Sequence, residues 1–362
     1  MRKTLKDMAK HLKNVITSEI PETYSINPRF ENISDEENIR EGVLAFRNFL
    51  YQLCDVLIVE GDSYDNQKKN AHEFDDRVTI SVYFPFLHNV KCLLLNIGYH
   101  GVIAQSAGYL TVGNHIFDTK IPASKSIECL RFLTACGILI EGINLIDKKP
   151  DLLKAEKIKI SCPDNPAMLT GLKVMAIAEI EFESIVNKLE VNKFNTISYC
   201  RFSDILLRCD YRVLKNNNSD DMISTLKDTM NPLSTNVQDF ILQLHKRYID
   251  NGLKCNMDIK DLWIKVKYFY KCKELWGITV SLNNGYQINI KAKNTHKYVD
   301  TIEKFPSFIQ EMIEKGYGCG IKRGISEHCN GGCQGYRFTL EDSILEIRND
   351  IETWLNTEMS FT

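Results

Sequence analysis

The sequence predicts an α+β fold in two domains, and three observations lead to this prediction. Segments with apolar residues at helical spacing fill much of the first half, whereas alternating apolar residues predict three consecutive strands between residues 264 and 290. A polar, asparagine-rich stretch, residues 215–221, separates these two parts. At 362 residues the chain is also too long for one domain of average size. We therefore expect an N-terminal helical arm (1–30), an N-terminal α+β domain (31–215), a linker (216–233) and a C-terminal α+β domain (234–362) with a Gly/Cys-rich loop (316–335).

The chain begins with two predicted helices. The first carries basic residues and places Leu5, Met8 and Leu12 on one face, which fits an ordinary amphipathic helix better than a helix on a membrane surface. In the second, Ser34 and Glu37 have the spacing of a capping box, and Gly61 is the expected end. Its apolar residues recur at helical spacing: Ile39, Val43, Phe46, Leu50 and Leu53.

Strands and helices alternate through the rest of the N-terminal domain. Gly137 follows one helix at the position where a left-handed backbone is needed, and Asn165-Pro166 is a strong helix start. The predicted strands are 77–84 (ended by Pro85), 109–113, 157–162 and 205–214, and the predicted helices are 88–98, 124–136 and 166–185.

The C-terminal domain is predicted to be an antiparallel meander covered by helices. Ser234 caps a helix that ends at Asn251-Gly252. Three strands follow, and Asn284-Gly285 between the second and third is typical of a two-residue hairpin turn in which both residues have positive φ. The remaining predicted elements are helical segments at 298–302 and 308–313, a strand at 336–340 and a last helix capped by Asp342 or Ser343.

The three tryptophans receive different predictions. Trp276 and Trp354 fall on apolar faces of a strand and a helix, so we expect both in the core. Trp263 falls, with Phe269, on the strand face opposite the apolar one, where it is expected to line a ligand surface.

Composition predicts a cytoplasmic protein. The basic N-terminus is not followed by the apolar region of a secretory signal, and most of the 12 cysteines stand singly in patterned segments, where cysteine behaves as a small apolar residue. Lys and Arg (45) nearly balance Asp and Glu (47), for a net charge of -2, which argues against nucleic acid as a partner. No membrane partner is expected, and the oligomeric state does not follow from the sequence.

The Gly/Cys-rich loop is the main candidate site. It holds seven of the 19 glycines together with Cys319, His328, Cys329 and Cys333, which are enough ligands for a tetrahedral Cys₃His zinc site. An iron–sulfur cluster needs similar thiolates and is the smaller part of this hypothesis. Because His328 and Cys329 are adjacent, they need not reach one ion, and Cys272 or an outside ligand is an alternative fourth ligand.

Two other interpretations of the loop remain open. Glycine-rich backbone forms nests of N–H donors, and Lys322, Arg323 and Arg337 would add positive charge for an anion or lower the pKa of a nearby thiol. Alternatively, the glycines make turns and the thiols pack against the sheet, so that the loop is structural.

A second candidate site is the acidic stretch at residues 60–76. Oxygen ligands of this kind suit Mg²⁺, Ca²⁺ or Mn²⁺, and a carboxylate there is also a candidate general base. A solvated turn is the competing interpretation. His88 and His100, which flank a predicted buried helix, are interpreted as structural histidines. The residues of the second site are Asp62, Asp65, His72, Asp75 and Asp76.

Several segments resemble a family of uncharacterised bacterial proteins. The resemblance rests on Gly316-Tyr-Gly-Cys-Gly, on Cys329-Asn-Gly-Gly-Cys-Gln-Gly and on the eight residues that follow, and it extends back through residues 60–65 and 74–77. It implies no activity, and no catalytic residue is transferred.

Three functional hypotheses follow. The first is a cytoplasmic protein that binds a metal or small ligand at the Gly/Cys-rich loop. The second is a thiol- or metal-dependent enzyme whose site involves residues 60–76. The third is a regulatory nucleic-acid-binding protein that uses its helices, and the near-neutral charge argues against it.

Overall fold

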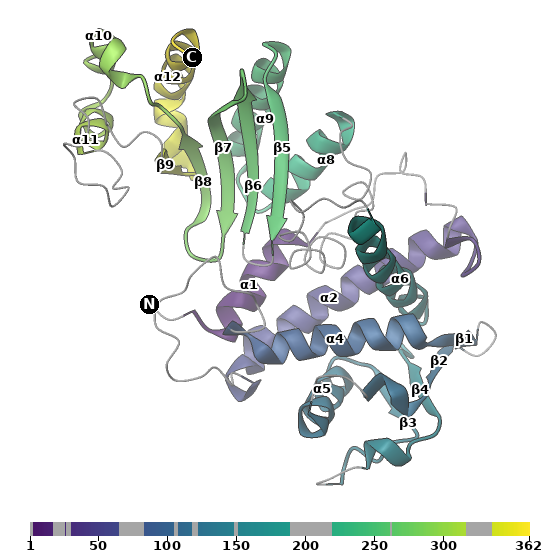
Figure 1. The fold of residues 1–362 in the computed structure, drawn as a ribbon. Coiled ribbons are helices and arrows are strands. Elements are labelled where there is room, and N and C mark those ends of the chain that lie inside the picture. Colours follow the sequence, from purple (N-terminus) through teal and green to yellow (C-terminus); the bar gives the residue numbers. More distant parts are fainter. Residues whose placement is uncertain are drawn as a thin grey trace. The chain divides into compact units, whose positions relative to one another are not determined.

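The computed structural model confirms the α+β class and shows two compact units (Figure 1). Unit 1 comprises residues 1–229 and 260–262, and unit 2 comprises residues 230–259 and 263–362. Each unit is treated by itself below. The structure describes residues 3–16, 26, 30–64, 83–104, 108–117, 122–147, 151–188, 219–260, 263–315 and 335–362.

Unit 1 is built mainly from helices. They are α1 (Leu5–Val15), α2 (Glu36–Tyr64), α4 (Pro85–His100), α5 (Ala123–Ala135), α6 (Ala167–Lys188) and α8 (Ser219–Met230), with short 3₁₀ turns at Asn114–Phe117 and Leu152–Lys154. Helix α8 lies within the range predicted as a linker, and its last residue is the first of unit 2.

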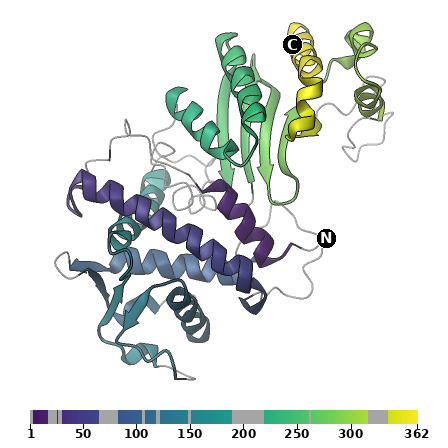
Figure 2. The same ribbon diagram turned by 180° about the vertical axis from the view of Figure 1, so that it is seen from behind.

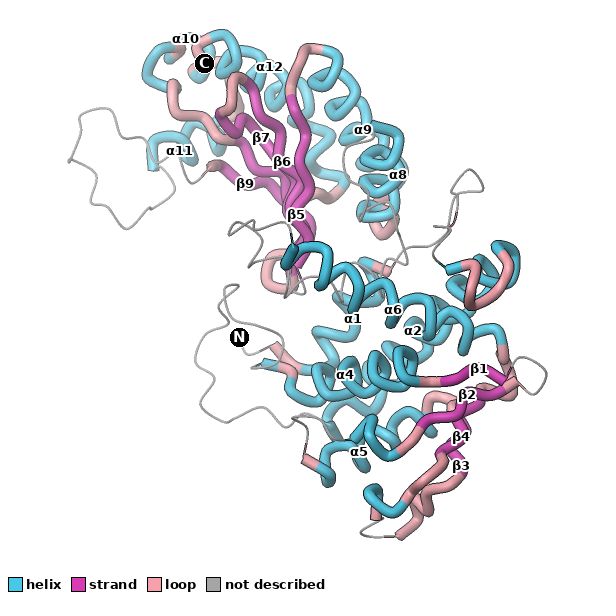
Figure 3. The backbone as a smooth tube through the Cα atoms, turned by 45° about the vertical axis from the view of Figure 1, so that its right-hand side comes forward, coloured by secondary structure: helices cyan, strands magenta, loops and turns pink. Residues whose placement is uncertain are grey.

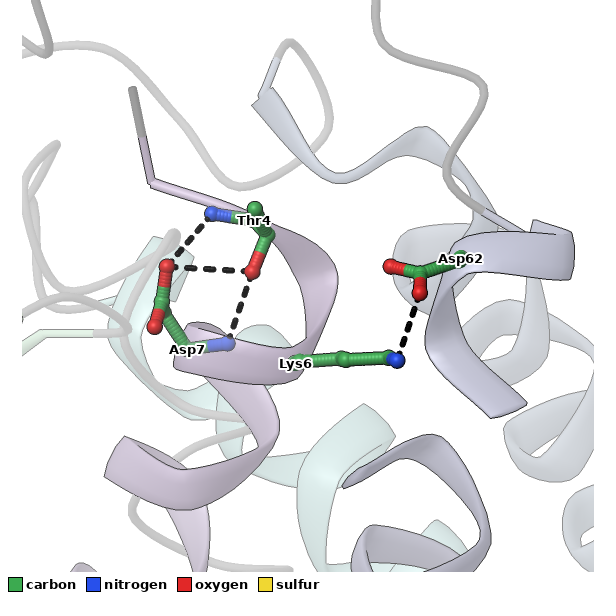
Figure 4. Close-up of polar contacts among 4 residues, drawn as sticks. All are labelled: Thr4, Lys6, Asp7 and Asp62. Atoms are coloured by element: carbon green, nitrogen blue, oxygen red, sulfur yellow. Dashed lines mark hydrogen bonds and ion pairs between the residues drawn. The ribbon is translucent and has the colours of Figure 1, made fainter. Parts of the chain in front are cut away.

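Helix α1 packs on the C-terminal half of α2 (Figure 4). A capping box starts α1, because Thr4 Oγ1 accepts a hydrogen bond from the Asp7 N–H (3.2 Å) and Asp7 accepts one from the Thr4 N–H (2.9 Å). The Asp7 carboxylate therefore has a pKa below its usual value, chiefly because of the Thr4 backbone hydrogen bond. Lys6 forms an ion pair with Asp62 (2.5 Å), and Gly61 leaves room for the Lys6 side chain between the two helices.

Glycines also set the crossing of α2, α4 and α6. A Cβ atom on Gly42 would lie 2.8 Å from the Gly171 nitrogen, and one on Gly98 would lie 2.7 Å from the Ala176 Cβ. The helix backbones therefore approach more closely than larger residues would allow. The apolar residues between them are almost fully buried, including Phe46, which is 0% exposed.

A small antiparallel sheet completes unit 1, and Figure 3 shows its strands in magenta. The strand order is β1 (Val102–Ala104), β2 (Tyr109–Val112), β4 (Ile158–Ser161) and β3 (Leu139–Glu141). Leu110 of β2 pairs with Ile160 of β4, and both are 0% exposed. The predicted strands at 109–113 and 157–162 are confirmed, whereas β1 and β3 were missed because three residues are too few for alternation to be recognised.

Unit 2 contains a five-stranded antiparallel meander in the order β5 (Lys254–Lys260), β6 (Trp263–Tyr270), β7 (Lys273–Ser281), β8 (Gly285–Ile290) and β9 (Tyr336–Thr339). One face is apolar: Val266, Ile278, Ile288 and Phe338 form a continuous buried row across four strands. Helices α9 (Thr235–Asp250) and α12 (Arg348–Ser360) lie on the same side of the sheet (Figures 1 and 2). They bring Tyr248 within 5.8 Å of Trp276 and Trp354 within 5.1 Å of Tyr336, measured between ring centroids.

A buried carboxylate ties α12 to the segment after β8. Glu358 is 2% exposed, and it accepts hydrogen bonds from the backbone N–H groups of Lys293 (2.9 Å) and Asn294 (3.1 Å) and from the hydroxyl of Tyr298 (2.5 Å). The Tyr298 hydroxyl in turn accepts one from Trp354 Nε1 (3.1 Å). Burial, followed by the hydrogen bond to Glu358, raises the pKa of Tyr298. Short helices α10 (Val299–Ile302) and α11 (Ser307–Lys315) follow, as predicted.

Three sequence predictions about element ends are wrong. Helix α2 does not end at Gly61 but continues to Tyr64, because α1 packs against its last turns and stabilises them. At the start of α2, the capping side chain is Asp35 rather than Ser34, since Asp35 accepts a hydrogen bond from the Asn38 N–H (2.8 Å). The predicted last helix is divided, since a 3₁₀ segment (Asp342–Ile347) precedes α12.

The β7–β8 turn also differs from the prediction. Ser281 pairs with Gly285, so the loop has three residues and only Gly285 (φ +64°) has positive φ. Two consecutive positive-φ residues occur instead at Lys271 (+46°) and Cys272 (+66°), between β6 and β7.

Two further strand predictions lie outside the described residues in whole or in large part. The range 205–214 lies wholly outside them, and so do residues 77–82; Pro85 begins helix α4. Strand β5 was missed because its sequence, Lys-Cys-Asn-Met-Asp-Ile-Lys, is too polar to be recognised as one.

One described helix, α2, is long and apolar enough to cross a membrane by length and composition alone. In the structure, 56% of its most apolar window is buried, and α1 and α6 pack on this helix. Trp276 and Trp354 are both 0% exposed, which confirms their prediction as core residues. The prediction that Trp263 lines a ligand surface is wrong, because this side chain is 5% exposed and the Lys265 ammonium lies 4.1 Å from its ring centroid.

Candidate functional site

The Gly/Cys-rich loop lies almost entirely outside the described residues. Cys319, Lys322, Arg323, His328, Cys329 and Cys333 all fall between the end of α11 at Lys315 and the start of β9. The described part is the base of the loop: Lys315 on one side, and Gly335 and Arg337 on the other.

The base of the loop is held firmly in unit 2. On one side, α11 is anchored by two buried side chains, Ile309 and Ile313. On the other side, all four residues of β9 pair with β8. Gly335 has φ +80°, and the side-chain amide of Asn289 lies directly where a Cβ would be, so only glycine fits there. The Asn289 Oδ1 atom is buried and has no hydrogen-bond partner among the residues that the structure describes.

Arg337, at the base of the loop, belongs to a row of directly paired residues that crosses four strands of the sheet. From β9 to β6 this row is Arg337, Asn289, Gly277 and Lys267. Directly paired residues in an antiparallel sheet point to the same face. Arg337 therefore shares a sheet face with a second cation, Lys267, whereas the loop cations Lys322 and Arg323 lie outside the described residues.

Only one member of the predicted acidic site is described. Asp62 is exposed near the end of α2, and one oxygen of its carboxylate forms an ion pair with Lys6. Asp65, His72, Asp75 and Asp76 lie outside the described residues. Across the described ranges, no three His, Cys, Asp or Glu side chains come together in a group that could hold a metal ion.

The described cysteines differ in their surroundings. Burial raises the pKa of the Cys54, Cys129 and Cys136 thiols to about 12, so these thiols stay neutral. These three cysteines therefore behave as small apolar residues, as predicted. Cys162 is also buried. Cys272 differs, since it is exposed in the β6–β7 turn.

One described thiol lies beside an imidazole. Cys92 Sγ is 3.6 Å from His88 Nε2, one turn apart on α4. Burial raises the pKa of Cys92 and lowers that of His88, so both groups are held neutral. An activated nucleophile requires the opposite shift in the thiol pKa, so this geometry describes a structural pair.

His100 has a partner that the sequence did not indicate. Its ring packs edge-on against that of His115, with centroids 4.9 Å apart, and both side chains are exposed. Burial, with the neighbouring charges of His115 and Lys173, lowers the pKa of His100. His115 comes from the 3₁₀ turn after β2, so only the tertiary fold brings the two together.

The structure also contains an open cavity of about 550 Å³ in unit 1. It lies where α2 and α6 begin and where the β1–β2 hairpin passes, and its walls include Asp35, Asn38, Tyr109 and Thr170. Among the described residues of its lining there are two carboxylates, Glu31 and Asp35, and no Lys or Arg, so this part of the cavity favours neutral or cationic groups. No sequence signal pointed to it, because its walls come from three separate segments.

Comparison with known proteins adds no assignment. No family model matches the chain, and neither the curated proteins nor the solved structures contain a significant match. The resemblance to uncharacterised bacterial proteins therefore stays a prediction.

Proposed function

We propose that this chain is a cytoplasmic protein that binds a metal ion or a small ligand at the Gly/Cys-rich loop of its C-terminal part. The proposed metal ligands are Cys319, His328, Cys329 and Cys333, and the proposed metal is zinc, with an iron–sulfur cluster as the second choice. The observation that carries the proposal is the concentration of four soft or borderline ligands within 15 residues of a loop that is rich in glycine.

The attachment of the loop supports this proposal. Both ends are fixed in one unit, by the buried side of α11 and by the pairing of β9 with β8. A loop whose ends are already close to their final positions loses less chain entropy when an ion gathers its ligands. Gly335, which has a left-handed backbone, immediately precedes β9. This end of the loop is therefore fixed by the sheet itself, independently of a bound metal ion.

Elemental analysis tests the proposal directly. Protein purified without metal-affinity chromatography is expected to hold about one zinc or iron per chain, and the double variant Cys329→Ser/Cys333→Ser is expected to hold none. Cys92→Ser is the matched control, because this half-buried thiol lies on α4 in unit 1. Cys272→Ser tests whether the exposed turn cysteine is the fourth ligand.

A stability measurement gives a second readout. All three tryptophans lie in unit 2, so their fluorescence follows the unfolding of the unit that carries the loop. Chelation is expected to lower the melting temperature of wild-type protein and to leave that of the double variant unchanged. Freshly isolated protein without bound metal, and with no response to chelator, would exclude a metal site.

A further inference from the structure

We infer that Tyr268 is a redox-active residue that gives up one electron to an oxidising radical while His245 takes up the phenol proton. The inference does not depend on a metal ion or ligand in the Gly/Cys-rich loop. It rests on three buried side chains of unit 2, which are Tyr268 on β6, Trp276 on β7 and His245 on α9.

The Tyr268 hydroxyl lies beside a base. Its oxygen is 2.8 Å from His245 Nδ1, a normal hydrogen-bond distance. Burial lowers the pKa of His245, so the imidazole is neutral at neutral pH. With the imidazole proton on Nε2, the Nδ1 atom accepts the hydrogen of the phenol and is also positioned to accept its proton.

A second hydrogen bond directs the phenol hydrogen toward His245. Cys255 of β5 bonds to the same hydroxyl, and burial raises the pKa of this thiol to about 12, so it stays protonated. A thiol sulfur is a weak acceptor, so the S–H group donates to the phenol oxygen and the phenol donates to Nδ1. The three side chains therefore form one chain of donors and acceptors, from Cys255 through Tyr268 to His245.

Burial prevents Tyr268 from losing its proton before its electron. The side chain is 0% exposed, and burial raises its pKa well above the usual value, so it is a neutral phenol at neutral pH. A phenol that loses an electron becomes a radical cation, which is a far stronger acid than an imidazolium. The proton therefore moves to His245 when the electron leaves, even though burial lowers the pKa of that imidazole.

Trp276 offers a path for the electron. Its ring is parallel to that of Tyr268, with 2° between the planes and 3.8 Å between the centroids, and the two residues pair directly across β6 and β7. The buried Trp276 Nε1 atom has no hydrogen-bond partner among the residues that the structure describes. An oxidised Trp276 has no neighbouring base for its proton, whereas Tyr268 has His245, so the electron vacancy comes to rest on Tyr268.

Two other buried tyrosines of unit 2 have different surroundings. Tyr248 is 0% exposed, and its hydroxyl donates to Asn356 Oδ1 (2.9 Å), an amide oxygen that is not a base. Tyr298 donates to a carboxylate, but its ring stacks on Phe361, which is not readily oxidised. Tyr268 combines a base at its hydroxyl with an indole stacked on its ring.

The reaction balances in two steps. In the first, one electron passes from Tyr268 through Trp276 to the oxidising radical, the phenol O–H bond breaks and an N–H bond forms at His245 Nδ1. In the second, a small enediol reductant supplies one electron and His245 returns the proton to the phenol oxygen. The resulting activity is the removal of oxidising radicals at the expense of the enediol.

Laser flash photolysis of the full-length protein with tris(bipyridine)ruthenium and an electron acceptor tests the inference, because the photogenerated ruthenium(III) complex is a one-electron oxidant. The wild-type protein should show the absorption band and EPR spectrum of a neutral tyrosyl radical. Part of this signal should decay slowly, since a buried radical cannot couple with a second one. Tyr268→Phe should lose the slow part, and Tyr248→Phe, a matched buried position, should keep it.

Two further variants test the proton acceptor and the electron path. His245→Asn keeps a hydrogen-bonding group near the phenol but removes the base, so the slow radical should form about 100-fold more slowly. Trp276→Phe should reduce its yield. Urea unfolding checks that each variant is folded. The inference is overturned if Tyr268→Phe keeps the slow signal, if Tyr248→Phe loses it equally, if His245→Asn forms it as fast as wild type, or if Trp276→Phe leaves its yield unchanged.

Discussion

The turn between β6 and β7 gives the sharpest prediction. Lys271 and Cys272 have φ of +46° and +66°, and Tyr270 pairs with Lys273, so these two residues form the whole turn. An ordinary L-residue in this left-handed region costs about 1–2 kcal/mol. Glycine has no such penalty, although it costs about 0.5–1 kcal/mol in chain entropy.

Cys272→Gly is therefore expected to stabilise unit 2 by about 0.5–1 kcal/mol. For a unit of this size, the expected rise in melting temperature is about 3 °C. Adding Lys271→Asn should increase the gain only slightly, because it removes the contact of the Lys271 ammonium with the Tyr270 ring, 4.9 Å from the centroid.

Urea unfolding followed by tryptophan fluorescence measures this effect in the full chain, because every tryptophan lies in unit 2. Cys272→Ser is the matched control: it removes the thiol, keeps a side chain at φ +66° and should leave the urea midpoint unchanged. If Cys272→Ser stabilises as much as Cys272→Gly, or if Cys272→Gly lowers the midpoint, backbone strain in this turn is the wrong explanation.

Three further predictions concern buried groups. Glu358→Ala should destabilise unit 2 by about 3–5 kcal/mol in urea unfolding, because four donors lose their buried acceptor, whereas Glu314→Ala, a change at an exposed position of α11, should cost much less. Gly171→Ala should destabilise unit 1 by about 1–3 kcal/mol, measured by hydrogen exchange of α2 and α6, since the new Cβ would collide with the backbone of Gly42; an unchanged exchange rate would contradict the close crossing. Burial lowers the pKa of His11 to about 4 from 6.5, so the unfolded chain takes up the proton first and unit 1 should lose up to about 3 kcal/mol between pH 6.5 and 4. His11→Gln should remove that part of the pH dependence, and an identical pH profile in the variant would show that His11 is not its source.

Local sequence patterns were sufficient for many elements. Apolar spacing and caps predicted α4, α5 and α9, and the Gly137 prediction agrees with its φ of +92° at the end of α5. Alternation predicted β6, β7 and β8 and the buried positions of Trp276 and Ile288. These features depend on a residue and its near neighbours, which is the information that a single sequence contains.

The candidate sites were less accessible to this reasoning. Composition alone drew attention to residues 316–335, but the row that joins Arg337 to Lys267 depends on the register of four strands. The contact of His100 with His115 and the cavity where α2 and α6 begin likewise join segments far apart in the chain.

The sequence by itself determined the α+β class, the meander and most of its core, because helical and strand periodicity are local properties. Only the tertiary structure decided that α2 passes Gly61, that Lys271 and Cys272 rather than Asn284 adopt positive φ, and that Glu358 is buried. In each case a partner from a distant segment outweighs the local preference: α1 supports the end of α2, strand register imposes the turn, and buried donors hold the carboxylate.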